Sequence, residues 1–201
     1  MAHTLPNFRL DGRMALVTGA SSGLGRHFAE VLAAAGARVA VAARRAELLE
    51  QLATTIRADG GVALPVPTDV SDEASIRRAY DLAESTFGRV DTVIANAGTG
   101  SSSRTLDLSV EEFDRLVAVN LRGVFTTVRE GARRMLAGPA SDRGRIVIVS
   151  SITAQHVTPG LAVYSATKAA VAQMGRVLAS EWARHGINVN MIAPGYIRTE
   201  L

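Results

Sequence analysis

Short apolar runs rich in Val, Ile and Ala alternate with longer amphipathic stretches along this chain of 201 residues. Six runs have the length and composition of buried strands: residues 13–18, 38–43, 61–66, 90–95, 145–150 and 187–192. The stretches between them have helical spacing: residues 24–35, 45–58, 72–87, 110–136 and 161–185. This alternation predicts a doubly wound α/β fold, in which helices cover both faces of a parallel sheet and ligands bind at the carboxyl ends of the strands.

The length and the charge of the chain limit the number of domains and the kinds of partner. A hydrophobic content of 47% is enough for one sizeable core, and the chain is too short for two domains of ordinary size. We therefore expect residues 1–201 to form a single domain. The 22 basic and 19 acidic residues are scattered along the sequence, whereas proteins that bind nucleic acids or membrane surfaces concentrate their charge. Neither partner is expected.

Cysteine is absent, which excludes disulfides and thiolate metal sites and favours a reducing cytoplasm. The four histidines do not have the spacing of metal ligands, so no metal site is predicted: His3, His27, His156 and His185. The first 14 residues lack the basic and apolar regions of a secretory signal, and no apolar stretch is long enough to span a membrane. We expect a soluble cytoplasmic protein.

The first predicted strand runs directly into a turn of small residues, TGASSGLG. The turn contains three glycines and two serines: Gly19, Ser21, Ser22, Gly23 and Gly25. Glycines let the backbone approach a phosphate, and the N-terminus of the following helix attracts an anion. The serines can cap this helix or bond the phosphate. The spacing differs from the standard GxGxxG dinucleotide fingerprint, so a tight turn without a ligand stays open as the alternative.

The second predicted strand ends without the acidic residue that usually holds the ribose 2′-hydroxyl of NAD. Ala43 stands at that position, and Arg44 and Arg45 follow it. A guanidinium can hold a phosphate through two parallel hydrogen bonds, so the sequence favours NADP over NAD, with Arg44 as the ligand of the 2′-phosphate. The alternative is that both arginines belong to a solvated first turn of the next helix.

Polar and small residues also follow the third and fourth predicted strands. Asp69 can accept a hydrogen bond from an adenine amino group or can be only a turn residue, and Ser71 is expected to cap the next helix. The turn NAG, residues 96–98, lets the backbone pass close to the cofactor ribose. Asn120 lies in an apolar stretch, and a buried amide needs partners. It is therefore either a satisfied structural residue or a link in a polar relay.

Tyr164 and Lys168 are one helical turn apart after the fifth predicted strand, so their side chains share a helix face. Lys168 is the only lysine of the chain. A nearby ammonium lowers the pKa of a phenol from its reference value of about 10, and a compact ammonium suits this role better than a rigid guanidinium. Ser150 and Ser151 offer a hydroxyl for a substrate oxygen. Taken alone, a Tyr–Lys pair at this spacing also occurs by chance on helix surfaces.

Taken together, these motifs resemble the short-chain dehydrogenase/reductase family. TGASSGLG, NAG, Asn120, the serine pair, YSATK and the Pro-Gly pair at 194–195 occur in the family's order over nearly the whole chain. The resemblance implies a Rossmann fold and NAD(P)-dependent hydride transfer between a ketone and a secondary alcohol. It also implies a homo-oligomer, a tetramer or a dimer, packed through the helices predicted at 110–136 and 161–185.

The resemblance also implies a role for each member of the catalytic set. Tyr164 is the general acid/base, and Lys168 lowers its pKa and contacts the nicotinamide ribose. The family serine lies thirteen residues before the tyrosine, which selects Ser151 over Ser150 as the residue that orients the substrate oxygen. Asn120 holds a relay water.

The predicted cofactor-binding set combines the motifs above with a loop that resembles the family's nicotinamide-side loop. Its members are Gly19, Ser21, Ser22, Gly23, Leu24, Gly25, Arg44, Asp69, Val70, Asn96, Ala97, Gly98, Tyr164, Lys168, Pro194, Gly195 and Thr199. Family members usually continue past this point through a substrate-covering segment and a last edge strand. We expect residues 1–201 to lack both, as a shortened form of the natural protein.

The function predicted from these residues is NADP-dependent interconversion of a ketone and a secondary alcohol, of the carbonyl or 3-oxoacyl reductase type. One alternative is an NAD-linked sugar or polyol dehydrogenase, which Ala43 and Arg44 count against. The other is a non-catalytic NADP(H)-binding sensor or partner-binding protein. The complete Ser-Tyr-Lys-Asn set counts against it, because a pure binder has no need for a tuned phenol.

Overall fold

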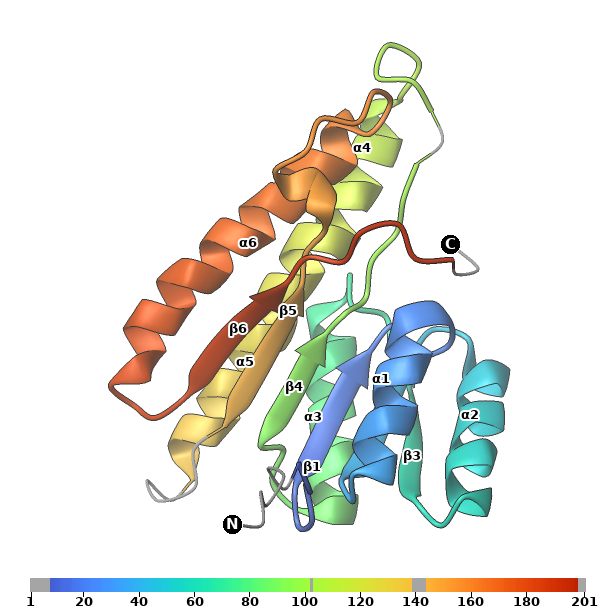
Figure 1. The fold of residues 1–201 in the computed structure, drawn as a ribbon, viewed down its shortest axis with the longest axis vertical. Helices are drawn as coiled ribbons and strands as arrows, with labels where there is room; N and C mark the ends of the chain where they lie inside the picture. The colour runs from blue at the N-terminus through green and yellow to red at the C-terminus, as the bar shows by residue number, and fades with distance from the viewer. Residues whose placement is uncertain (1–7, 102, 139–143, 199–201) are drawn as a thin grey trace, which may run out of the picture.

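The computed structural model describes residues 8–101, 103–138 and 144–198, which build a six-stranded parallel sheet between two layers of helices (Figure 1). The strands are β1 (Met14–Thr18), β2 (Arg38–Ala43), β3 (Val62–Pro67), β4 (Thr92–Ala95), β5 (Arg145–Val149) and β6 (Asn188–Ile192). Their order in the sheet is β3-β2-β1-β4-β5-β6, and every neighbouring pair is parallel. The order reverses between β1 and β4, as in the Rossmann fold, and the predicted fold class is confirmed.

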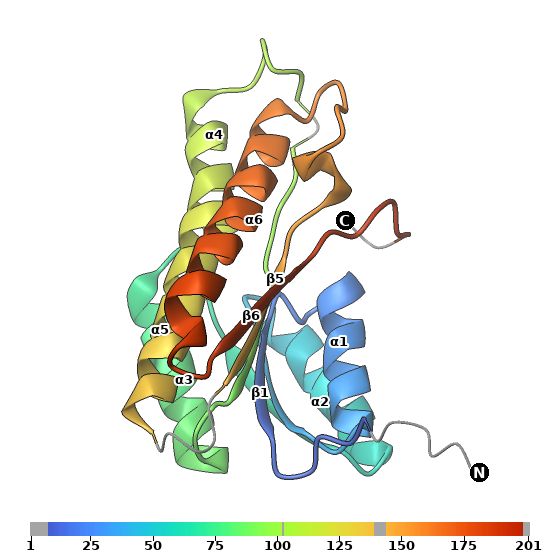
Figure 2. The same ribbon diagram turned by 60° about the vertical axis from the view of Figure 1, so that its left-hand side comes forward.

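The helices divide between the two faces of the sheet, as Figure 2 shows. They are α1 (Gly23–Ala34), α2 (Ala46–Ala58), α3 (Glu73–Phe87), α4 (Val110–Val117), α5 (Val124–Ala137) and α6 (Ala162–Ala183). Helices α1 and α2 bury one apolar cluster against the sheet, and α3, α5 and α6 bury a second on the opposite face. Because both faces are covered, the inner strands are mainly apolar, and all five residues of β1 are buried.

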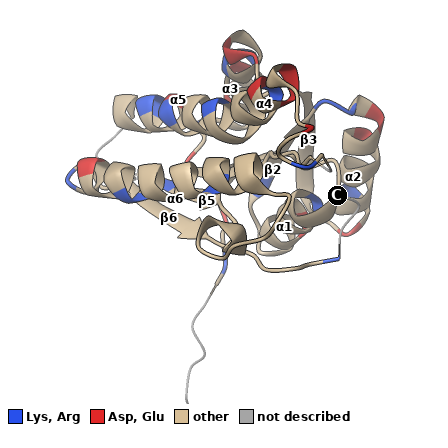
Figure 3. Cartoon of the chain, turned by 90° about the horizontal axis from the view of Figure 1, so that it is seen from above, with Lys and Arg blue, Asp and Glu red and all other residues tan. Residues whose placement is uncertain are grey.

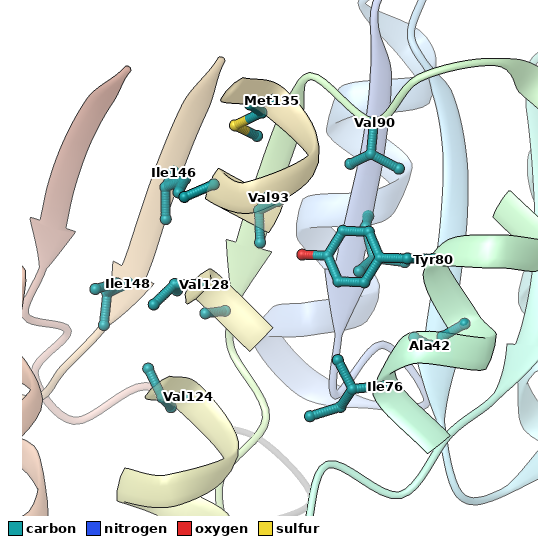
Figure 4. Packing of buried hydrophobic residues seen from close by; sticks show 14 of the residues in the cluster. Ala42, Ile76, Tyr80, Val90, Val93, Val124, Val128, Met135, Ile146 and Ile148 are labelled. Atoms are coloured by element: carbon teal, nitrogen blue, oxygen red, sulfur yellow. The ribbon is translucent and has the colours of Figure 1, made fainter. Parts of the chain in front are cut away.

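Tyr80 anchors the larger of the two clusters between α3, α5 and the sheet (Figure 4). Its ring is fully buried, and its hydroxyl donates to the Thr127 carbonyl oxygen of α5 at 2.9 Å. A side chain at Gly131 would come within 2.6 Å of the Tyr80 hydroxyl, so α5 approaches α3 closely at this point. Burial raises the pKa of Tyr80, because a phenolate would lose its hydration there.

The long helix predicted over 110–136 is not one α-helix. A π-helical turn, Ala118–Gly123, separates α4 from α5. A π-turn adds a residue to the helical repeat and occurs frequently at functional sites. At Gly123 it allows close packing, because a side chain there would come within 2.9 Å of the Val70 carbonyl oxygen. Asn120 lies in this turn and is fully buried.

The capping residue predicted for α3 was wrong. Asp72 is the N-cap, and its carboxylate accepts from the Ala74 backbone N–H at 2.9 Å. The Ser71 hydroxyl instead donates to Asp69 Oδ1 at 2.7 Å. Both Ser71 and Asp72 are good capping residues, so the choice depends on where the turn before α3 ends.

A network of ion pairs joins α5 to α3. Glu130, 7% exposed, accepts from Arg133 at 2.7 Å and from Arg134 at 2.6 Å. Arg134 also contacts Asp81 at 2.6 Å and Glu84 at 2.8 Å. The basic residues of this network lie along α5, where the cartoon in Figure 3 shows several blue segments that mark Lys and Arg.

We expect Glu130→Gln to lower the free energy of unfolding at pH 7 by about 1–2 kcal/mol, less than the full pKa shift implies because Arg133 is exposed to water. Hydrogen bonds from Arg133 and Arg134 lower the pKa of Glu130 to about 2, from 4.5 in an unperturbed chain. A depressed folded-state pKa gives stability that is fully present above pH 4.5 and lost as pH falls through about 2. Urea unfolding between pH 7 and pH 2 measures this. A difference between variant and wild type that stays constant with pH would contradict the assignment.

Candidate functional site

A cavity of about 650 Å³ opens at the carboxyl ends of the strands, the upper end of the sheet in Figure 1. Most of the predicted site residues line it: Gly19, Ser21, Ser22, Leu24, Gly25, Arg44, Asp69, Val70, Asn96, Ala97, Gly98, Ser151, Tyr164, Lys168, Pro194 and Gly195. Gly23 and Asn120 do not line it, and Thr199 lies outside the described residues. The fold thus gathers most of the predicted catalytic and cofactor-binding positions around one space.

The glycine turn after β1 is shaped for close approach. Gly19 has φ of +68°, and a Cβ on Gly25 would overlap the Gly19 carbonyl oxygen and the Asn96 amide. The Asn96 side chain donates to the carbonyl oxygens of Thr18 at 3.0 Å and Gly19 at 3.3 Å, which ties the end of β4 to the turn. Ser22 occupies the N-cap position of α1 without making a capping bond. The first turn of α1 therefore has no side-chain cap and suits an anion.

Arg45 spans the same turn, which the sequence prediction missed because it assigned the phosphate to Arg44 alone. The Arg45 guanidinium donates to the Ser21 hydroxyl at 2.9 Å and to the Ser22 hydroxyl at 2.7 Å. Both arginines line the cavity, and within the described residues neither pairs with a carboxylate at salt-bridge distance. This end of the cavity therefore carries two positive charges and suits an anion.

Asp69 makes the contacts of a turn residue. Its Oδ1 accepts from the backbone N–H of Ser71 at 2.9 Å and from the Ser71 hydroxyl at 2.7 Å. The Ser71 hydroxyl bond lowers the pKa of Asp69, burial opposes the shift, and the charge of Arg44 adds to it. Asp69 is thus an anion at the cavity wall. The alternative of a turn residue is supported by these bonds, and the contact with adenine stays a prediction.

Lys168 lies behind the Tyr164 ring. It is 4% exposed, its ammonium donates to the Val149 carbonyl oxygen at 3.0 Å, and its nitrogen lies 5.7 Å from the centre of the Tyr164 ring. Burial lowers the pKa of Lys168 to about 8, so the ammonium is still mostly protonated at pH 7. Tyr164 is half-buried and faces the cavity. The pair places a positive charge beside a phenol that a ligand can reach.

The two serines after β5 differ in their contacts. Ser150 donates to the Lys168 carbonyl oxygen at 2.8 Å and fastens α6 to the sheet. The Ser151 hydroxyl accepts from the Thr153 backbone N–H at 3.2 Å and from the Thr153 hydroxyl at 3.0 Å. These contacts leave the Ser151 proton to donate into the cavity. The geometry thus suits the choice of Ser151 over Ser150 as the serine that holds a substrate oxygen.

The Asn120 side chain is satisfied by neighbouring protein groups. Its oxygen accepts from the Thr99 backbone N–H at 2.8 Å, and its nitrogen donates to the Thr99 carbonyl oxygen at 2.8 Å and to the Thr167 hydroxyl at 3.3 Å. These bonds favour the structural alternative for the side chain. The relay role stays a prediction.

In the part of the chain that the structure describes, no group of three or more His, Asp or Glu side chains could hold a metal ion. Among the same residues, no helix has the length and hydropathy to cross a bilayer.

The family model of the short chain dehydrogenases matches residues 13–201. The chain belongs to this family. Its members are NAD(P)-dependent oxidoreductases that act on CH–OH groups, and this chain is such an enzyme. The cavity fits the cofactor, because the first turn of α1 at its wall has no side-chain cap and suits a pyrophosphate.

Three relatives illustrate the range of the family. The chain is 37% identical over 195 residues to D-threitol dehydrogenase of Mycolicibacterium smegmatis. This match covers 97% of this chain and 74% of the relative. The structure of 3-ketoacyl-(acyl-carrier-protein) reductase from Brucella melitensis in complex with NADH has a TM-score of 0.91 and 37% identity, and the match covers 96% of this chain and 78% of that one. Gluconate 5-dehydrogenase from Burkholderia cenocepacia, solved with NADP and tartrate, has a TM-score of 0.90 and 37% identity, covering 97% and 75%.

Proposed function

We propose that this enzyme transfers hydride between NADP(H) and a ketone or secondary alcohol, as a carbonyl or 3-oxoacyl type reductase. The observation that carries the choice of NADP is the pair of arginines at the end of β2. Arg44 and Arg45 line the cavity without a carboxylate at salt-bridge distance in the described residues, and Ala43 replaces the acid expected for NAD.

In the proposed reaction the bound nicotinamide supplies or accepts the hydride. Tyr164 donates its phenolic proton to the substrate oxygen during reduction and takes it back during oxidation. The ammonium of Lys168 stabilises the phenolate by charge. The Ser151 hydroxyl donates to the substrate oxygen and holds it opposite the phenol. Asn120 supports the site through Thr99.

The proposed cofactor-binding residues are those predicted from the sequence, with Arg45 added to Arg44. Support comes from their position in the cavity wall, apart from Gly23, which begins α1, and Thr199, which the described residues do not include. Gly23 contributes as the first residue of the helix that faces the pyrophosphate.

The second candidate is an NAD-linked sugar or polyol dehydrogenase. The similarity to D-threitol dehydrogenase favours it, as does the NADH bound to the related 3-ketoacyl reductase. The non-catalytic alternative does not hold, because the chain belongs to a family of NAD(P)-dependent oxidoreductases.

We also propose that residues 1–201 form one domain, which assembles as a homotetramer or homodimer in the cytoplasm. Exposed apolar side chains on α4, α5 and α6 suit an interface between copies: Phe113 at 45%, Phe125 at 37% and Val177 at 46% exposure. The absence of cysteine suits a reducing compartment. Light scattering on the purified protein determines the oligomeric state, and a monomer would contradict this assembly.

A fluorescence titration with NADPH and NADH side by side tests the cofactor, followed by initial rates with ketones, sugars and acyl thioesters. Much tighter binding of NADPH, together with reduction of a ketone, is the expected result. Equal or tighter binding of NADH would move the assignment to the second candidate.

A further inference from the structure

The loop after β4 forms part of the cavity wall beside the catalytic lysine. Thr99 and Gly100 line the cavity, and a side chain at Gly98 would lie 3.4 Å from the Lys168 ammonium. The segment is therefore beside the proposed reaction end of the cavity, whereas Arg44 and Arg45 follow β2, on the other side of β1. The side chains that hold Thr99 and Gly100 in place therefore also determine the shape of the cavity that Tyr164 lines.

Two side chains hold this segment, one from α4 and one from the π-helical turn that follows it. The Asn120 side-chain oxygen accepts from the Thr99 N–H, and its nitrogen donates to the Thr99 carbonyl oxygen, each at 2.8 Å. Arg115 of α4 donates to the Thr99 hydroxyl at 2.9 Å and to the Gly100 carbonyl oxygen at 3.3 Å. The two contacts differ in kind, because Asn120 fixes the backbone, whereas Arg115 turns the Thr99 side chain toward α4.

Apart from its two contacts with the loop, the polar interactions of Arg115 among the described residues stay within α4. Its side chain is 49% exposed, and among the described residues its one ion pair is with Glu112, one turn earlier, at 3.7 Å. Exposed pairs at this spacing contribute little to stability, a few tenths of a kcal/mol. The main effect of its two contacts with the loop is therefore to position the cavity wall at Thr99 and Gly100.

We infer that Arg115 is a positioning residue for the substrate, acting through Thr99 and Gly100. The inference rests on the proposed function, since it assigns the loop to the substrate side of a ketone reductase. Arg115 does not line the cavity and touches neither the phenol nor the cofactor end. Its loss should therefore change substrate binding more than the proton-transfer step.

Arg115→Ala is expected to raise KM for a ketone substrate about 10-fold. The kcat and the NADPH dissociation constant should change less than about twofold. Arg115→Lys keeps a donor and should recover part of the loss. Arg78→Ala is the matched control, an exposed arginine in a single ion pair with Asp72 on α3, and should leave KM unchanged. Thermal unfolding of all three variants should stay close to wild type. An unchanged KM in Arg115→Ala, or a loss confined to kcat, would overturn the inference.

Thr99→Val shows whether Arg115 acts through the loop. If it does, adding Arg115→Ala to Thr99→Val should raise KM by much less than Arg115→Ala does alone, whereas independent roles would give additive effects and contradict the inference.

Amide hydrogen exchange of the peptide that contains Gly100 gives a readout without catalysis, and Arg115→Ala should speed it. If wild type turned over no carbonyl compound, the proposed function would fail. Faster exchange would then still support the contact between Arg115 and the loop, and unchanged exchange would overturn it.

Discussion

Replacing Tyr164 with phenylalanine should reduce turnover by a factor on the order of 10³ and leave NADPH binding within about twofold of wild type. The change removes one oxygen at the cavity wall and leaves the aromatic ring beside the Lys168 ammonium. Ser151 can still hold the substrate oxygen, but a serine hydroxyl does not exchange a proton readily near neutral pH. Steady-state rates with a ketone and a fluorescence titration of NADPH measure the two effects separately.

Tyr80→Phe is the matched control for this experiment. The same atom is removed, but Tyr80 lies in the core between α3 and α5, and its hydroxyl donates to Thr127. We expect normal turnover and a free energy of unfolding lower by about 1 kcal/mol, from one lost buried hydrogen bond. Activity that persists in Tyr164→Phe would remove Tyr164 from the role of acid/base.

The fold was predictable because a parallel sheet covered on both faces leaves a simple pattern in the sequence. Its inner strands are mainly apolar, and they therefore appear as short runs rich in Val, Ile and Ala. Thus β2, Arg38–Ala43, coincides with the predicted run at 38–43, and β4 begins two residues after the predicted start at 90. Strand ends vary because residues such as Val90 are buried without belonging to the ladder.

The π-turn at Ala118–Gly123 was not predictable from hydrophobic spacing. Both α4 and α5 are amphipathic, and a single extra residue between them only rotates one apolar face against the other. The contacts of Asn120 depend on this rotation. The bond from Asn120 to Thr99 joins residues 21 positions apart, which no local pattern indicates.

The candidate site was predicted by position more fully than by contact. Each glycine, serine and arginine was placed at a strand end, and the parallel sheet brings the strand ends together. Which arginine reaches the glycine turn depends on the direction of each side chain at the start of α2. The contacts of Arg45 with Ser21 and Ser22 therefore became visible only in the structure.

The second large effect is expected at these two arginines. If they hold the 2′-phosphate, replacing both Arg44 and Arg45 with alanine should weaken NADPH binding about 100-fold, because hydrogen bonds between charged groups contribute about 1.5–3 kcal/mol each. NADH has no 2′-phosphate, and its affinity should change by less than about threefold. Each single variant should lose part of the preference for NADPH over NADH. The larger loss is expected for Arg45→Ala, because the Arg45 guanidinium already spans the turn.

Titrations with 2′,5′-ADP and 5′-AMP isolate this effect from the nicotinamide end. The double variant should lose its preference for 2′,5′-ADP, and Arg78→Ala on α3 should keep it. An equal loss of affinity for both nucleotides would mean that the arginines support the turn through Ser21 and Ser22 and do not bind the 2′-phosphate. A wild-type protein that does not distinguish the two nucleotides would contradict the choice of NADP itself. The salt dependence of nucleotide binding increases with the number of charges that pair in the complex. In the double variant it should therefore decrease for 2′,5′-ADP and stay unchanged for 5′-AMP.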